Sequence, residues 1–171
     1  MNIYLIGFMG CGKSTLGKKL SNKLNYHFID LDQYIEQQEK RTIQEIFEDS
    51  GESTFREMES QYLRAIPGEK GNYTIATGGG LPVHNQNMDY MNQQGLTIYL
   101  QMEPKQLFYR LKHAKTERPL LKNKNDEEVL EYIEQTLKYR EPFYQQAKLT
   151  IKAFNIKINY LVEQIETQLG S

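Results

Sequence analysis

Residues 7–14 of the chain read GFMGCGKS, directly after the apolar segment of residues 3–6. A segment with helical spacing follows, with leucines at positions 16, 20 and 24. The G-x-x-x-x-G-K-S pattern between an expected strand and an expected helix is typical of a loop that binds nucleotide phosphates. Its glycines let several backbone N–H groups point into one concavity, and the helix N-terminus favours negative charge. We therefore predict that Lys13 reaches the β- and γ-phosphates and that the Ser14 hydroxyl binds Mg²⁺.

Strand-like and helix-like segments alternate along the rest of the chain. Beyond residues 3–6, strands are expected at residues 26–31, 73–76, 96–100 and 149–151. Helices are expected at residues 14–24, 32–40, 42–49, 52–66, 84–94, from Pro104, at 126–141 before an interruption by Pro142, and at 155–169. This alternation predicts an α/β fold, with a five-stranded parallel sheet between two layers of helices. Binding sites in such sheets lie at the carboxyl ends of the strands.

Length and composition limit the classes of protein that fit. The chain has 171 residues, which is enough for one domain with a core. Its net charge of −1 lacks the basic excess of a nucleic-acid-binding protein. No apolar run approaches the roughly 20 residues of a membrane span, and the N-terminus does not read as a signal peptide. A cytoplasmic protein without a membrane partner is therefore expected. The single cysteine, Cys11, excludes an internal disulfide.

Two motifs follow expected strands. Asp30 and Asp32 lie two residues apart, so they share a face of the strand end, where one carboxylate could support Mg²⁺ and the other an acceptor hydroxyl. The run of glycines at 78–80 suggests that the backbone approaches a ligand closely. The alternatives are a helix cap for the aspartates and a flexible turn for the glycines.

Three arginines are candidates for binding anionic groups. Arg56 could grip a carboxylate with two parallel hydrogen bonds, unless it is a surface residue paired with a glutamate along its helix. Arg118 lies in the polar, lysine-rich segment of residues 113–125 and could act from a mobile lid on a transferring phosphoryl group. Arg140 ends a helix just before a proline.

A GTPase is excluded although residues 123–126 fit the guanine-binding pattern N-K-x-D. No convincing strand precedes this tetrapeptide, and no D-x-x-G element exists in the chain to sense a γ-phosphate. The tetrapeptide is better explained as a solvated loop that caps the following helix.

The ordered set of motifs resembles the shikimate kinase family. The motifs are GFMGCGKST at 7–15, DLD at 30–32, FREME at 55–59, GGG at 78–80, RPLL at 118–121 and YREPFY at 139–144. The resemblance implies one domain of residues 1–171 with the fold of nucleoside monophosphate kinases, a substrate-binding region at about 32–62 and a lid at about 113–124. It also implies transfer of the γ-phosphoryl group of ATP to the 3-hydroxyl of shikimate, within the chorismate pathway to aromatic amino acids.

The resemblance further implies roles for individual residues around ATP. The ATP phosphates would be held by Gly10, Cys11, Gly12, Lys13, Ser14 and Thr15, and by Arg118 from the lid. Ser14 would bind Mg²⁺, and Asp30 would support the metal through water.

On the acceptor side, the resemblance implies that shikimate is bound by Asp32, Arg56, Gly79 and Arg140. The two arginines would clamp its carboxylate, and the Gly79 amide would meet a ring hydroxyl. Apolar positions matching a wall for the ring are Ile43, Phe47 and Phe55. The catalytic residues would be Lys13, Asp32 and Arg118. Whether Asp32 removes the hydroxyl proton or only orients the hydroxyl stays open.

Two rival functions remain at this point. One is another small-molecule kinase, such as a gluconate or nucleoside monophosphate kinase, and the other is a nucleotide-dependent switch protein. Arg56, Gly79 and Arg140 favour a carboxylated acceptor, and the missing D-x-x-G element argues against a switch. The adenine site does not align at residues 152–157, and Arg110 either stacks on adenine or lies on a helix surface. A monomer that binds only small molecules is expected.

Overall fold

The computed structural model describes residues 1–66, 72–114 and 121–170, and in these residues five parallel strands form one sheet. The strands are β1 (Asn2–Ile6), β2 (His27–Asp30), β3 (Tyr73–Ala76), β4 (Gly95–Gln101) and β5 (Leu149–Lys152). Their order across the sheet is β2-β3-β1-β4-β5, and every neighbouring pair is parallel. All five residues of β1 are buried. This explains its nearly unbroken apolar sequence, since a central parallel strand is covered on both faces.

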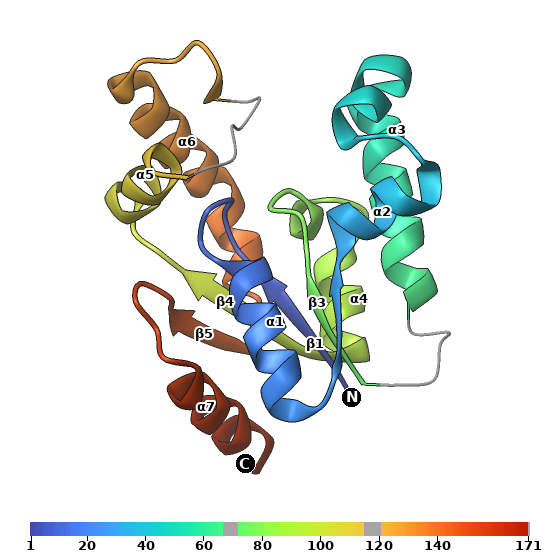
Figure 1. Ribbon diagram of the computed structural model, residues 1–171, viewed down its shortest axis with the longest axis vertical. Helices are drawn as coiled ribbons and strands as arrows, with labels where there is room; N and C mark the ends of the chain where they lie inside the picture. The colour runs from blue at the N-terminus through green and yellow to red at the C-terminus, as the bar shows by residue number, and fades with distance from the viewer. Residues whose placement is uncertain (67–71, 115–120, 171) are drawn as a thin grey trace.

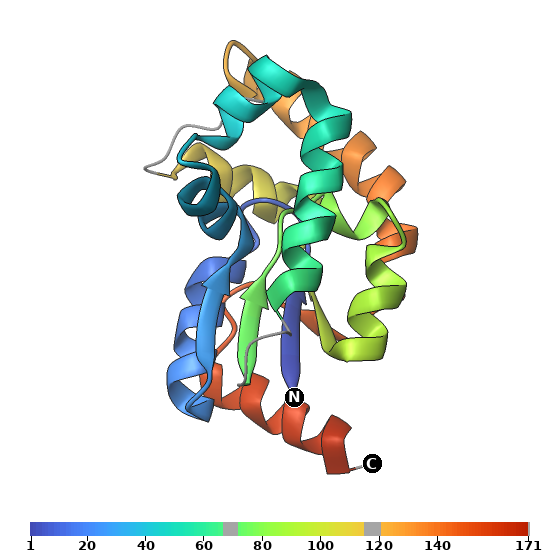
Figure 2. The same cartoon turned by 90° about the vertical axis from the view of Figure 1, so that its right-hand side faces the viewer.

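Helices cover both faces of the sheet. They are α1 (Lys13–Leu24), α2 (Leu31–Glu39), α3 (Ile43–Ala65), the short 3₁₀ helix η2 (Leu81–Val83), α4 (Asn87–Gln94), α5 (Pro104–Lys112), α6 (Asp126–Tyr144) and α7 (Ile158–Gly170). Helices α1 and α7 contact each other on one side, while α4 packs against β4 on the opposite side (Figures 1 and 2). The predicted three-layer fold with a five-stranded parallel sheet is confirmed.

The helix boundaries differ from the prediction at four places. The expected helices at 42–49 and 52–66 are joined in α3, which bends at Gly51 because this glycine has non-helical angles, with φ of 78°. The expected interruption at Pro142 is wrong, since α6 continues to Tyr144. The expected helix at 84–94 begins only at Asn87, after the 3₁₀ turn of η2. The expected helix at 155–169 begins only at Ile158.

The carboxyl ends of the strands gather the predicted motifs at one edge of the sheet. The phosphate-loop motif follows β1, Asp30 ends β2, and the three glycines at 78–80 follow β3. In Figure 1 this edge points upward, with α2 and α3 on one side of it and α5 and α6 on the other. In the part of the chain that the structure describes, no helix has the length and apolar character needed to cross a membrane.

The start of β4 offers a test of this strand packing. Gly95 lies beside Asn2 of β1, and a Cβ atom at Gly95 would sit 2.2 Å from the Asn2 carbonyl oxygen. Because backbone of a central strand cannot easily move, we expect Gly95→Ala to lower the free energy of unfolding by about 2 kcal/mol or more in urea titrations. Gly170→Ala, where nothing lies within 4 Å, is the control and should change it by less than about 0.5 kcal/mol. Equal stability of the two variants would contradict this packing.

Candidate active site

The Lys13 side chain folds back onto the loop between β1 and α1. The Lys13 Nζ donates to the carbonyl oxygens of Gly7 at 2.8 Å and Phe8 at 3.0 Å. The side chain is half-buried, so its charge is only partly screened by solvent. The loop thus presents a positive charge where the N-terminus of α1 begins.

Backbone N–H groups at the start of α1 add to this positive end. Gly12 caps the helix in the left-handed conformation, with φ of 100°, and the first intrahelical bond runs from Leu16 N–H to the Gly12 carbonyl. The N–H groups of Lys13, Ser14 and Thr15 precede this bond and are therefore available to an anion. The Cys11 N–H is used within the loop, where it donates to the Phe8 carbonyl at 3.2 Å, and the Cys11 side chain is buried.

Arg110 of α5 lies against the same loop. A Cβ atom at Gly12 would be 3.4 Å from Arg110 Nη2, so the guanidinium covers this glycine closely. Of the two sequence-based interpretations of Arg110, a plain helix-surface residue is therefore the poorer description, because its charged end faces the phosphate loop.

Ser14 and Asp30 join the phosphate loop to the end of β2. The Ser14 hydroxyl donates to Asp30 Oδ2 at 2.5 Å, while Asp30 Oδ1 accepts from the Gln33 N–H at 3.4 Å and caps α2. Both predicted interpretations of Asp30, site residue and helix cap, are thus compatible. A hydroxyl and a carboxylate beside a phosphate loop are the all-oxygen donors that Mg²⁺ prefers. Among the described residues no group of three or more His, Cys, Asp or Glu side chains could hold a metal.

Asp32 and Glu59 converge on the glycine turn after β3. A Cβ atom at Gly78 would lie 2.7 Å from Glu59 Oε1 and 3.1 Å from Asp32 Oδ1, so only glycine leaves room for both carboxylates. Burial raises the pKa of Asp32, and the nearby Asp30 carboxylate raises it further, while Lys13 and Arg56 oppose the shift. Glu59 is 1% exposed, and burial raises its pKa to about 7 although Arg56 lies beside it.

Arg56 binds Glu59 and faces the same turn. Its Nη1 lies 2.6 Å from Glu59 Oε2, and its Nη2 lies 3.3 Å from Glu52 Oε1. A Cβ atom at Gly80 would lie 2.7 Å from Arg56 Nη2. The predicted pairing of Arg56 with glutamates along its helix is therefore real, but it aims the guanidinium at the glycine turn rather than at open solvent.

Aromatic rings lie beside the Arg56 guanidinium. Phe47 and Phe55 pack with ring centroids 4.7 Å apart, and Arg56 Cζ lies 6.0 Å from the first centroid and 5.4 Å from the second. Phe55 is buried, whereas Phe47 and Ile43 are half-buried against the core. The three apolar residues predicted to wall a ring thus come from the same helix as Arg56.

Arg140 reaches the glycine turn from α6. A Cβ atom at Gly79 would lie 3.0 Å from Arg140 Nη1 and 3.4 Å from the Gly7 carbonyl oxygen. The Arg140 guanidinium also lies 5.8 Å from the centroid of Phe8 in the phosphate loop. Two arginines from different helices therefore point at one backbone turn, next to a loop suited to phosphate.

Comparison with known proteins agrees with this geometry. The sequence model of the family described as Shikimate kinase matches residues 9–169. The chain belongs to the shikimate kinase family. A shikimate kinase from Bacteroides fragilis is 44% identical over 169 residues, which cover 99% of this chain and 94% of that protein.

Solved structures of shikimate kinases match the whole fold. One from Bacteroides thetaiotaomicron has a TM-score of 0.93 at 41% identity and covers 100% of this chain and 99% of its own. Another, from Acinetobacter baumannii in complex with shikimate, has a TM-score of 0.81 at 36% identity, covering 98% of this chain and 91% of its own. The chain is therefore an ATP-dependent kinase of this family, as its motifs predict, and the two rival functions fall away.

Most of the predicted site residues meet at one edge of the sheet. Ser14 of the phosphate loop contacts Asp30. Asp32 and Arg56 both lie against the glycine turn, and Arg140 faces Gly79 in that turn. Arg118 lies outside the described residues, as does much of the predicted lid, so their predicted roles stay predictions. Sequence reasoning gave no role to Glu59 and Tyr144, although each lies one helical turn from a predicted arginine, a spacing that puts two side chains on one helix face.

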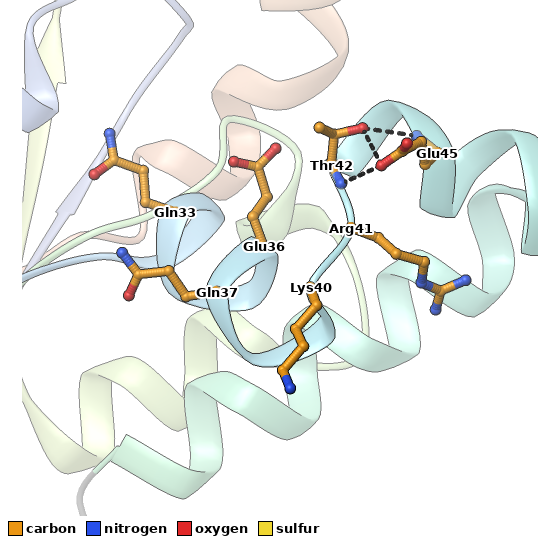
Figure 3. Close-up of a pocket in the computed structure, with 7 residues that line it drawn as sticks. All are labelled: Gln33, Glu36, Gln37, Lys40, Arg41, Thr42 and Glu45. Atoms are coloured by element: carbon orange, nitrogen blue, oxygen red, sulfur yellow. Dashed lines mark hydrogen bonds between the residues drawn. The ribbon is translucent and has the colours of Figure 1, made fainter.

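A hollow of about 390 Å³ lies beside the junction of α2 and α3 (Figure 3). Its lining residues are Gln33, Glu36, Gln37, Lys40, Arg41, Thr42 and Glu45. The Thr42 N–H donates to Glu45 Oε2 at 2.7 Å, and the Glu45 N–H donates to Thr42 Oγ1 at 3.2 Å, so these two residues form a capping box (Figure 3). Glu36 Oε1 also accepts from the Ile43 N–H at 2.9 Å. These bonds fix the start of α3, the helix that carries Arg56 and Glu59.

The raised pKa of Glu59 makes stability depend on pH. The Glu59 carboxyl keeps its proton up to about pH 7 in the folded chain, whereas the ordinary pKa of a glutamate is 4.5. The protonated carboxyl therefore stabilises the folded chain fully below pH 4.5, and this stabilisation is lost as the pH rises through 7. Glu59→Gln mimics the protonated form. We expect the free energy of unfolding of the variant, relative to the original chain, to rise between pH 4.5 and 8 by no more than about 3 kcal/mol.

Urea titrations at several pH values measure this difference. Glu57→Gln, which removes an exposed carboxylate from the same helix, controls for the loss of one negative charge. A Glu59→Gln difference that stays constant across the pH range would contradict the raised pKa.

Proposed function

We propose that the residues at the carboxyl edge of the sheet transfer the γ-phosphoryl group of ATP to the 3-hydroxyl of shikimate. One observation carries the proposal: Arg56 and Arg140, from two different helices, both face the glycine turn beside the phosphate loop. A small acceptor with a carboxylate needs such a pair of planar cations, because each can form two parallel hydrogen bonds with it. The shikimate complex of the Acinetobacter baumannii relative supports the same acceptor.

The phosphate side of the site would be built by the loop and by α1. The N–H groups of residues 13–15 and the Lys13 ammonium would bind the phosphate oxygens and stabilise the negative charge that develops on the transferring group. In exchange, Lys13 would leave or share its bonds to the carbonyls of Gly7 and Phe8. Arg118 would add a second cation from the lid.

Mg²⁺ is the metal that the donor atoms fit. The Ser14 hydroxyl would bind it directly, and Asp30, already 2.5 Å from that hydroxyl, would support it through water. When bound, the ion would neutralise phosphate charge during transfer. Asp30 thereby has two tasks, since the same carboxylate caps α2.

Asp32 would bind the acceptor hydroxyls. Its raised pKa brings the carboxylate closer to the strength of a general base, because a stronger base accepts a proton more readily near neutral pH. The two roles considered for Asp32, orienting the hydroxyl and accepting its proton, are thus both compatible with its surroundings. Gly79 would offer its N–H to a ring hydroxyl, and the apolar face of α3 would pack against the ring.

The proposal also covers the organisation of the chain. Residues 1–171 would form one domain, with about 32–62 as the substrate-binding region and about 113–124 as the lid. A monomer would suffice, because the predicted site residues that the structure describes all come from one chain. The cytoplasmic location stays a prediction from the sequence.

Loss of the Lys13 charge should remove most activity without unfolding the chain. We expect Lys13→Ala to lower kcat by about 10³-fold, since charge stabilisation in the transition state is lost. The fold should survive, because the Lys13 side chain is half-buried and is not part of the apolar core. Coupled ADP-release assays and circular dichroism measure the two effects. Lys19→Ala, an exposed lysine on the same helix, is the control. Activity of Lys13→Ala within tenfold of the original chain would refute the role of the phosphate loop.

Arginine substitutions should separate acceptor binding from catalysis. We expect Arg140→Ala and Arg140→Lys to raise the shikimate Kd at least about tenfold while the Kd for MgATP changes less than twofold, because lysine lacks the planar fork. Arg118→Ala should instead lower kcat more than it weakens acceptor binding. Titration calorimetry with each ligand provides the measurement, with Lys138→Ala, exposed on the same helix, as the control. An unchanged shikimate Kd in Arg140→Ala would leave Arg140 as a surface charge.

A further inference from the structure

Tyr144 connects the last turn of α6 to the glycine turn after β3. Its side chain is fully buried, and its hydroxyl donates to the Gly79 carbonyl oxygen at 2.6 Å. This bond joins a buried side chain to the backbone of a predicted substrate-binding residue. Neither the phosphate loop nor the metal side of the site uses this tyrosine.

The neighbouring glycines are held in a different way. The Gly78 carbonyl accepts from the Leu81 N–H at 3.3 Å, and the Gly80 carbonyl accepts from the Val83 N–H at 3.1 Å. Both bonds belong to the 3₁₀ turn that follows. The Gly79 carbonyl is held instead by Tyr144. Because glycine has the widest choice of backbone angles, this bond restricts the residue of the turn that would otherwise be freest to rotate.

The position of the Tyr144 ring is itself fixed. Its ring lies against that of Tyr99, with centroids 5.0 Å apart. The Tyr99 hydroxyl donates to Glu141 Oε2 at 2.9 Å, and Gln101 Nε2 donates to Glu141 Oε1 at 3.2 Å. These bonds tie the last turn of α6 to β4. Burial raises the pKa of Tyr144 to about 12, so its hydroxyl keeps the proton that it donates.

The same helical turn carries Arg140. Arg140 and Tyr144 share a face of α6, because they are four residues apart. A Cβ atom at Gly79 would lie 3.0 Å from Arg140 Nη1. One turn of α6 thus supplies both a cation for the acceptor carboxylate and a bond to the backbone that would meet an acceptor hydroxyl. The distance between these two contacts is therefore set by one rigid element.

We propose that Tyr144 is a positioning residue for the acceptor: by holding the Gly79 carbonyl it fixes the backbone of the glycine turn at Gly79, and with it the position of the Gly79 N–H that would meet a shikimate hydroxyl, at a set distance from Arg140. The inference rests on the proposed function, because it names a further determinant of the same acceptor site. Tyr144 touches neither the substrate nor the transferring group, and it acts through Gly79.

Tyr144→Phe removes the hydroxyl and keeps the ring. We expect the shikimate KM and Kd to rise about tenfold, in line with the loss of one buried hydrogen bond, while kcat falls less than threefold and the KM for MgATP stays within twofold. Tyr4→Phe, which removes the hydroxyl of another fully buried tyrosine on β1, is the matched control and should leave the shikimate KM within twofold.

Deoxy analogues of shikimate, each lacking one ring hydroxyl, separate positioning from general loosening. For the analogue that lacks the hydroxyl bound by Gly79, the original chain and Tyr144→Phe should have the same Kd, whereas the other analogues should retain the tenfold difference. An equal loss of affinity for all analogues would overturn the inference. So would an unchanged shikimate Kd in Tyr144→Phe beside an original chain that binds shikimate. Absence of shikimate binding by the original chain would instead overturn the proposed function.

A measurement on the original chain decides the question if the variant does not fold. With glycine carbonyls labelled with ¹³C, the Gly79 resonance should lie at the position of a hydrogen-bonded carbonyl before shikimate is added and should move little on binding. A large movement on binding would show that the substrate, and not Tyr144, positions the Gly79 backbone.

Discussion

The structure depends on how the central strand ends. β1 is buried on both faces between β3 and β4, so its backbone cannot bend gradually toward the site. The chain turns instead at Gly7, with φ of 141°, where a Cβ atom would lie 2.9 Å from the carbonyl oxygen of Leu100 in β4. A residue with a side chain could not make this turn. The phosphate loop and the contacts made to it from β2, α5 and α6 follow from this constraint.

Charge determines how the gathered residues behave. Asp32 and Glu59 lie close together, and burial raises the pKa of both carboxyl groups. Lys13, Arg56 and Arg140 offset this, and the Arg56–Glu59 pair at 2.6 Å is the most buried of the ion pairs in the described residues. Burying a charged pair adds little stability by itself, because desolvation opposes the attraction. Its value here is geometric, since Glu59 holds the guanidinium toward the glycine turn and away from solvent.

Sequence patterns predicted what local chemistry controls. The alternation of strands and helices gave the layered parallel sheet, and because parallel strands end at one edge, it also gave the meeting of the phosphate loop with the motifs after β2 and β3. The T-x-x-E spacing at residues 42–45 is another local pattern, and in the structure it forms the capping box at the start of α3. Contacts between distant segments could not be predicted from the sequence. The spacing of Arg56 and Glu59 fits an ion pair on a helix surface, whereas the burial of Glu59 against Gly78 depends on how α3 packs on the sheet.

The failure of the prediction at Pro142 has the same origin, and it bears on the site. A proline in a helix removes one N–H bond, here to the Lys138 carbonyl, and costs about 3 kcal/mol in a helix interior. Pro142 and Lys138 are both exposed, so water can reach that carbonyl, and the bonds of Glu141 to Tyr99 and Gln101 hold the turn from the other side. The helix therefore continues for two residues beyond the proline, which is the length required to bring Tyr144 onto the face of Arg140 and under Gly79.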